Sequence, residues 1–70
     1  MIILNENGEK REALYVYKVI RESFNGEQCK RSKKYYSNEP LHIGGLYVHL
    51  GTGFPGMQRV LEFVGFYELP

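Results

Sequence analysis

The fold is decided by residues 44–64, GGLYVHLGTGFPGMQRVLEFV, which hold five of the eight glycines and two short apolar segments. Between these segments, residues 51–56 read GTGFPG, a literal match to the G-x-G-x-x-G of dinucleotide-binding folds. Those folds place an acidic residue on a second parallel strand about 20 positions further on, and only fourteen residues follow Gly56. Pro55 also removes one backbone amide from a phosphate cradle. We therefore expect a structural hairpin loop and no bound cofactor.

The first apolar segment, residues 46–50, alternates between apolar and polar side chains as a half-buried strand does. The side chains of Leu46, Val48 and Leu50 are predicted to face the core. Those of Tyr47 and His49 are predicted to face the other way, towards solvent.

The second apolar segment, residues 57–64, fits two templates. Met57, Val60, Leu61 and Val64 have the spacing of one helical face, and Gly65 would suit the C-terminal cap of such a helix. The same segment also fits the alternation of a strand. We favour the strand, because a six-residue loop between two short runs is ordinary for a hairpin. Gly65 is then expected to end the strand, and residues 66–69 to add a last short strand or turn.

Upstream, three further strands are predicted around two Asn-Gly turns. Asn7-Gly8 follows the apolar residues 1–4, and Asn-Gly between apolar runs is a strong hairpin signal because both residues tolerate positive φ. Residues 12–22 fit helical or strand spacing, and their content of Tyr and Val favours the strand. Asn25-Gly26 then predicts an antiparallel strand over residues 28–36, ended by the segment 37–40. Its many charges place that strand at a sheet edge.

A resemblance supports this reading of the middle of the chain. The glycine pair Gly44-Gly45, the run Leu46-Tyr47-Val48, the glycine-rich loop and Arg59-Val60-Leu61-Glu62 resemble the middle strands of Src-homology-3-like small barrels. The resemblance covers about 25 residues, concerns the fold and implies no activity. The sequence therefore predicts an all-β fold, built as a small antiparallel barrel or bent sheet. If residues 57–64 are helical, the fold gains one short helix.

Length and composition predict one small domain spanning residues 1–70. The single cysteine, Cys29, excludes an intrachain disulfide and fits a reducing compartment. Neither a signal-peptide pattern nor an apolar run of about 20 residues occurs, so we expect a cytoplasmic protein with no membrane partner. Cys29, His42 and His49 lack the spacing of a zinc site, so we expect no metal. Nothing in the sequence pairs a nucleophile with a base, so we expect no enzyme.

The basic charge is concentrated in residues 28–38, which carry four basic and no acidic side chains, whereas the rest of the chain is net acidic. Basic side chains neutralise phosphates with release of counterions, and tyrosines stack on unpaired bases. We therefore predict a non-enzymatic binding module for nucleic acid, with an acidic protein surface as another partner and a solvated charged edge strand as the alternative. The candidate binding residues are Lys30, Arg31, Lys33, Lys34, Tyr35, Tyr36 and Tyr47.

The competing hypothesis is a protein-interaction or self-associating domain, for example a homodimer. A 70-residue core is marginal in size, and ten aromatic residues exceed what such a core needs. Phe54, at the tip of the glycine-rich loop, is the candidate protein contact, because a monomer has little reason to expose it. The alternative is that Phe54 folds back as a lid on the barrel end.

Overall fold

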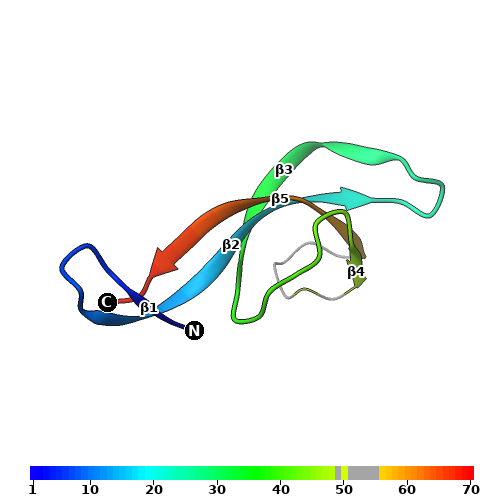
Figure 1. The fold of residues 1–70 in the computed structure, drawn as a ribbon. Helices are drawn as coiled ribbons and strands as arrows, with labels where there is room; N and C mark the ends of the chain where they lie inside the picture. Colours follow the sequence, from blue (N-terminus) through cyan, green and yellow to red (C-terminus); the bar gives the residue numbers. More distant parts are fainter. Residues whose placement is uncertain (49, 51–55) are drawn as a thin grey trace.

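The computed structural model describes residues 1–48, 50 and 56–70, and it contains five strands (Figure 1). They are β1 (Ile2–Leu4), β2 (Lys10–Glu22), β3 (Gln28–Ser37), β4 (Leu46–Val48) and β5 (Met57–Glu68). All paired strands are antiparallel, so the predicted all-β fold is confirmed. Residues 57–64 belong to a strand, and the helical alternative for them is wrong. His49, Phe54 and the loop 51–55 lie outside the described residues.

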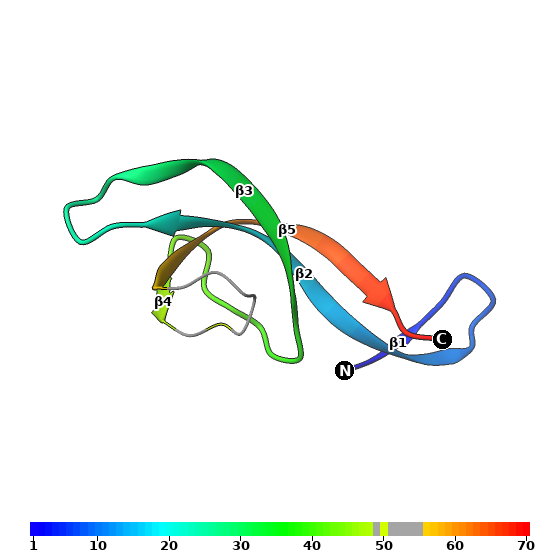
Figure 2. The ribbon, with the colours of Figure 1, turned by 180° about the vertical axis from the view of Figure 1, so that it is seen from behind.

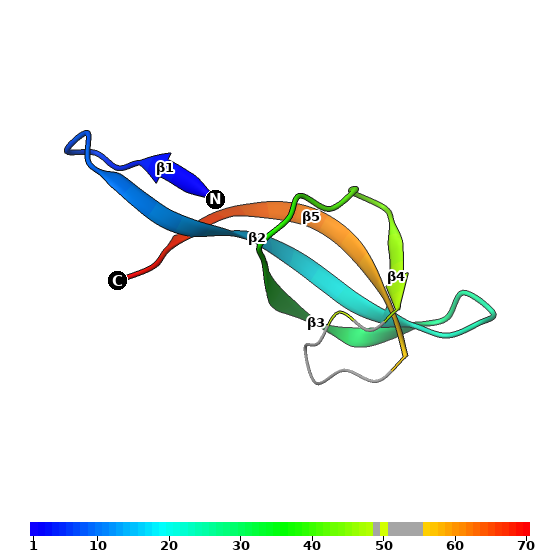
Figure 3. The same ribbon diagram turned by 90° about the horizontal axis from the view of Figure 1, so that it is seen from below.

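β2 organises the sheet, because it pairs with β1, β3 and β5. β4 pairs with the start of β5, which gives the order β1-β2-β5-β4 with β3 also on β2. The sheet curls strongly, and Figures 1, 2 and 3 show an open half-barrel. Within the described part of the chain β3 and β4 do not pair, so the strands do not close into a full barrel.

The molecule is elongated, with principal extents of 46 × 18 × 18 Å. Its radius of gyration is 13.7 Å, against about 11 Å for a compact chain of this length. The β2–β3 turn forms one end of the long axis, and the β1–β2 turn with the end of β5 forms the other (Figure 1).

Both predicted Asn-Gly turns are present and share one design. In the first, the N–H of Asn5 donates to the carbonyl of Glu9 at 3.0 Å, and three residues, 6–8, form the loop. In the second, the N–H of Ser23 donates to the carbonyl of Glu27 at 2.7 Å around residues 24–26. Each loop ends on a glycine with positive φ, 78° and 86° in turn, as in three-residue hairpins with a left-handed last residue.

The core lies on one face of the sheet, here called the core face. Tyr17, Val19 and Val60 are buried there, and half-buried side chains pack around them. Those surrounding side chains are Tyr15, Tyr35, Leu41, Tyr47 and Leu50. Since three residues make the centre of the cluster, rings from the neighbouring strands supply much of its cover.

The prediction that Leu46 and Val48 face the core is wrong, whereas Leu50 packs against the core cluster as predicted. Tyr47 lies opposite Gln58 and packs against the core, whereas Leu46 and Val48 are 41% and 54% exposed on the other face. The hydroxyl of Tyr47 accepts a hydrogen bond from the N–H of His42 at 2.9 Å. Tyr47 thus packs its ring on the core face while its hydroxyl takes part in a hydrogen bond, as buried tyrosines usually do.

The prediction that Gly65 ends a strand is also wrong, because β5 runs through it to Glu68. Gly65 lies opposite Val16 and Phe63 lies opposite Tyr17, so Val64 is an extra residue in a β-bulge. Leu61 is a second extra residue, between the partners of Val19 and Lys18. Bulges bend a strand and increase its twist, and two of them in β5 account for the curl of the sheet.

The connection between β3 and β4 is held against the sheet by hydrogen bonds to the Tyr17 hydroxyl and to the backbone of Val60. The N–H of Leu41 donates to the hydroxyl of Tyr17 at 2.9 Å. The N–H of Gly44 donates to the carbonyl of Val60 at 2.7 Å, and the N–H of Val60 donates to the carbonyl of Gly45 at 3.0 Å. A Cβ on Gly45 would lie 2.9 Å from both the His42 carbonyl oxygen and the Tyr47 ring, so the close approach requires glycine.

Candidate nucleic-acid interface

The predicted binding residues of β3 divide between the two faces of the sheet. Alternation along β3 places Lys34 and Tyr36 on the face opposite the core, here called the outer face. Lys33 and Tyr35 lie on the core face, and Tyr35 packs against the core cluster, as Tyr47 does. Of the three predicted tyrosines, Tyr36 is the one with an exposed ring, at 47%.

Tyr36 has a ring partner that the sequence analysis missed. The ring of Tyr67, on β5, lies 5.3 Å from that of Tyr36 between centroids, with 52° between the planes. The two rings meet across Val16 of the intervening strand, which pairs with Tyr36 on one side and with Gly65 on the other. Val16 is consequently 5% exposed although it lies on the outer face. The ring pair itself remains about half exposed.

Two lysines flank this ring pair on the outer face. Lys34 lies directly opposite Lys18, and Lys18 lies opposite Glu62 on its other side. Like charges on directly opposite residues destabilise a strand pair. An anion bound beside the rings would remove that repulsion.

The remaining two predicted cations, Lys30 and Arg31, lie in an irregular part of the β2–β3 pairing. Ile20 pairs with Ser32 and Glu22 pairs with Gln28, so three residues of β3 lie opposite Arg21 alone. The surplus residues form a shallow depression of about 260 Å³, lined by Arg21, Cys29, Lys30 and Arg31. Three cationic side chains from two strands therefore surround one hollow, and its lining includes no acidic residue.

Arg21 is the residue of this depression that sequence reasoning missed. It belongs to β2, outside the basic run, and it joins Lys30 and Arg31 through the irregular register alone. No periodicity in the sequence signals that register.

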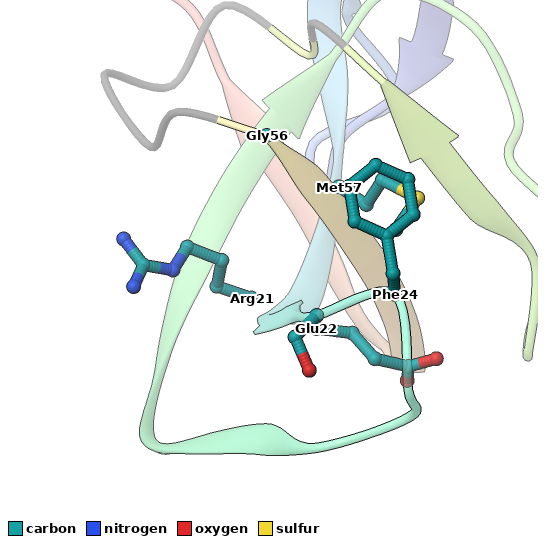
Figure 4. A pocket seen from close by; sticks show the side chains of 6 residues that line it. Arg21, Glu22, Phe24, Gly56 and Met57 are labelled. Atoms are coloured by element: carbon teal, nitrogen blue, oxygen red, sulfur yellow. The ribbon is translucent and has the colours of Figure 1, made fainter.

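The acidic residue next to Arg21 on β2, Glu22, already forms hydrogen bonds with Arg59 and Gln28. Its carboxylate accepts from Nε and Nη2 of Arg59 at 2.7 and 2.6 Å and from Nε2 of Gln28 at 2.8 Å. These bonds lower the pKa of Glu22 from 4.5 to about 2, with the Arg59 hydrogen bond as the largest cause. They likewise raise the pKa of Arg59. Figure 4 shows Arg21 and Glu22 pointing in opposite directions, so Glu22 does not neutralise the depression.

In residues 1–48, 50 and 56–70, no three His, Cys, Asp or Glu side chains gather closely enough to hold a metal ion. No helix that is long and apolar enough to cross a membrane occurs among the described residues. Comparison with protein-family models, with curated proteins and with solved structures gives no match. The functional argument therefore rests on the geometry of this chain.

Proposed function

We propose that this protein is a non-enzymatic binding module that contacts nucleic acid through the basic end of its β2–β3 hairpin. The observation that carries the proposal is the depression lined by Arg21, Cys29, Lys30 and Arg31, whose lining holds three cations and no acidic residue. A phosphate group matches such a hollow in charge, and phosphate contacts supply most of the affinity of non-specific nucleic-acid binding. The cytoplasm is the location we propose for this activity.

The charge of the whole hairpin supports the same proposal. Residues 18–34 carry six basic and two acidic side chains, a net charge of +4. Within the described residues, Lys18, Arg21, Lys30, Arg31 and Lys34 form no ion pair, whereas the acidic Glu22 does. Five cations are thus available to phosphates.

The ring pair Tyr36–Tyr67 provides a second type of contact. Both rings are about half exposed, and Lys34 lies on the same face of β3 as Tyr36. A base stacked on an aromatic side chain contributes about 1–3 kcal/mol, without requiring a particular sequence. We therefore expect single-stranded DNA or RNA to bind more tightly than duplex of the same length.

The test is fluorescence anisotropy with labelled single-stranded and duplex oligonucleotides of about 20 nucleotides, titrated between about 50 and about 200 mM salt. The triple variant Arg21→Gln, Lys30→Gln, Arg31→Gln should bind more weakly. It should also reduce the slope of log K against log [salt] by about 2, because each lost phosphate contact to a single strand removes about 0.7.

The matched control is Lys10→Gln, which removes a lysine from the opposite end of β2. It should leave the affinity and the salt slope unchanged. Absence of binding at about 50 mM salt, or a triple variant with the affinity of the wild type, would refute the proposal. Tighter binding of polyglutamate than of an oligonucleotide of equal charge would refute it as well, and would identify an acidic protein surface as the partner.

For the fold, we propose that the half-barrel is of the Src-homology-3-like type. The pairing of Leu46–Val48 with the start of β5 supports this assignment, because these are the segments that carry the resemblance. An experimentally determined structure tests it. Strand connections that cannot be superimposed on a five-stranded barrel of that type would contradict it.

A further inference from the structure

The second half of β5 has a free edge. One edge of β5 pairs with β2 along its whole length, from Met57 to Glu68. On the other edge, β4 pairs with residues 57–59, and the connection before β4 adds bonds to Val60. From residue 61 to residue 68, no described strand pairs with this edge. Eight residues of backbone are thus open to pairing with another strand.

The free edge of β5 differs in chemistry from that of β3. β3 carries four lysine and arginine side chains, which discourage edge-to-edge association. Residues 61–68, LEFVGFYE, contain no lysine, arginine or proline. Four of their apolar side chains are 44–52% exposed, namely Phe63, Val64, Phe66 and Tyr67. The charges of this edge are limited to Glu62 and Glu68, near its two ends. A long edge with four exposed apolar side chains between them marks a surface that a partner strand covers.

The sequence of this edge is complementary to itself. In an antiparallel pairing of two copies centred between Val64 and Gly65, Phe63 of each copy lies opposite Phe66 of the other. Glu62 lies opposite Tyr67, and the terminal Glu68 lies opposite Leu61, so no two like charges face each other. In a dimer with a two-fold axis, each such contact occurs twice, once from each copy, and this register satisfies that condition.

The bulge at Val64 places Phe63 and Phe66 on the same face of β5, as pairing in this register requires. Residues three apart in a regular strand point to opposite faces, but Phe63 and Phe66 share a face, with their ring centroids 5.2 Å apart. Both rings contact Tyr15, at 6.4 and 5.6 Å between centroids, in an aromatic cluster on the core face. Pairing two copies in this register joins their clusters across the axis.

The surface area of the chain agrees with a dimer. Its accessible surface is 5112 Å², against about 4,500 Å² for a compact monomer of 8.2 kDa. The excess is comparable to the roughly 800 Å² that each partner buries in a standard interface. From the free edge, its composition, its register and this excess, we infer that two copies of the chain form a symmetric dimer by antiparallel pairing of their β5 strands.

The test combines a measurement of mass with a measurement of the contact. Sedimentation velocity from micromolar to millimolar concentration should give twice the monomer mass of 8.2 kDa. Val64→Lys places a charge next to the axis on a side chain that is already 47% exposed, and should give the monomer mass. Val48→Lys makes the same change at the β4 edge, on a side chain 54% exposed, and should retain the dimer mass.

The contact is measured on the wild type, so it does not depend on a variant that folds. In a sample mixed from isotope-labelled and unlabelled chains, filtered nuclear Overhauser spectra should connect the ring of Phe63 in one copy with that of Phe66 in the other. A monomer at every concentration would overturn the inference. A dimer whose intermolecular contacts come from β3 or β4 would overturn it too.

Discussion

At the scale of single residues, Glu22 makes the connections that hold the basic end of the molecule. Its carboxylate binds Arg59 of β5 and Gln28 of β3, and Nη1 of Arg59 donates to the carbonyl of Gly44 at 2.6 Å. Three strands and the connection before β4 therefore meet at one ion pair. The Glu22 side chain is 8% exposed and that of Arg59 is 32% exposed, so the pair is partly shielded from solvent.

This ion pair predicts a specific dependence of stability on pH. The pKa of Glu22 is about 2 in the folded chain, below its ordinary value of 4.5. The ion pair therefore stabilises the fold fully above pH 4.5, and its contribution is lost as the pH falls from 4.5 towards 2. Glu22→Gln should be less stable than the wild type at neutral pH, and the difference should shrink to zero through this window.

Urea denaturation at a series of pH values measures the difference. Glu6→Gln is the control, because Glu6 lies in the exposed β1–β2 turn and forms no ion pair with any described residue. A gap between Glu22→Gln and the wild type that stays constant with pH would contradict the prediction.

Single residues also mark where sequence reasoning about the site ends. The basic run Lys30–Lys34 and its position at a sheet edge could be predicted from the sequence, because a strand with so many charged side chains is rarely buried. The convergence of Arg21 with Lys30 and Arg31 depends on an irregular register. The contact of Tyr36 with Tyr67 joins β3 to β5 across β2. Neither register nor cross-strand neighbours follow from periodicity along one strand.

At the scale of elements, the strands and turns were predictable and the buried side of β4 was not. The Asn-Gly turns and the β-branched and aromatic runs indicate β1, β2, β3 and β5 by local physics. Alternation in β4 separates two sets of side chains but does not say which set is buried. In the structure, Tyr47 is on the buried side, where it pairs with Gln58 and its hydroxyl accepts a hydrogen bond from the N–H of His42.

The hydroxyls of Tyr17 and Tyr47 predict how firmly the connection before β4 is attached. They accept hydrogen bonds from the N–H groups of Leu41 and His42. Tyr17→Phe and Tyr47→Phe should each lower the free energy of unfolding by about 1 kcal/mol, because a backbone N–H loses its acceptor. Amide hydrogen exchange at Leu41 should accelerate in the first variant, and exchange at His42 in the second.

Tyr67→Phe is the control for both variants. Its ring contact with Tyr36 is kept, and its hydroxyl forms no hydrogen bond with any described group. Thermal unfolding should shift by several degrees in the two test variants and remain unchanged in the control. Equal stability of all three variants would show that the two bonds do not hold the connection.

At the scale of the whole molecule, the basic depression and the free edge of β5 lie towards different ends, and Tyr67 is the residue that the ring pair and the free edge share. The basic depression is beside the β2–β3 turn, and the free edge of β5 runs towards the opposite end of the long axis (Figure 2). The triple variant Arg21→Gln, Lys30→Gln, Arg31→Gln should therefore sediment with the mass of the wild type even though it loses nucleic-acid affinity. A triple variant with the monomer mass would place the hairpin inside the interface and contradict this separation.

The role of β2 as the shared neighbour of three strands has a consequence for the order of folding. The hairpins that β2 forms with β1 and β3 close loops of three residues, and such hairpins form within about 1–10 μs. The pairing of β2 with β5 joins residues as far apart as Ala13 and Glu68, and contacts between such distant residues form slowly. Val60, a central core residue, is on β5. During synthesis, the side chains of Tyr17 and Val19 therefore remain exposed on the β2–β3 hairpin until β5 has left the ribosome and Val60 can pack against them.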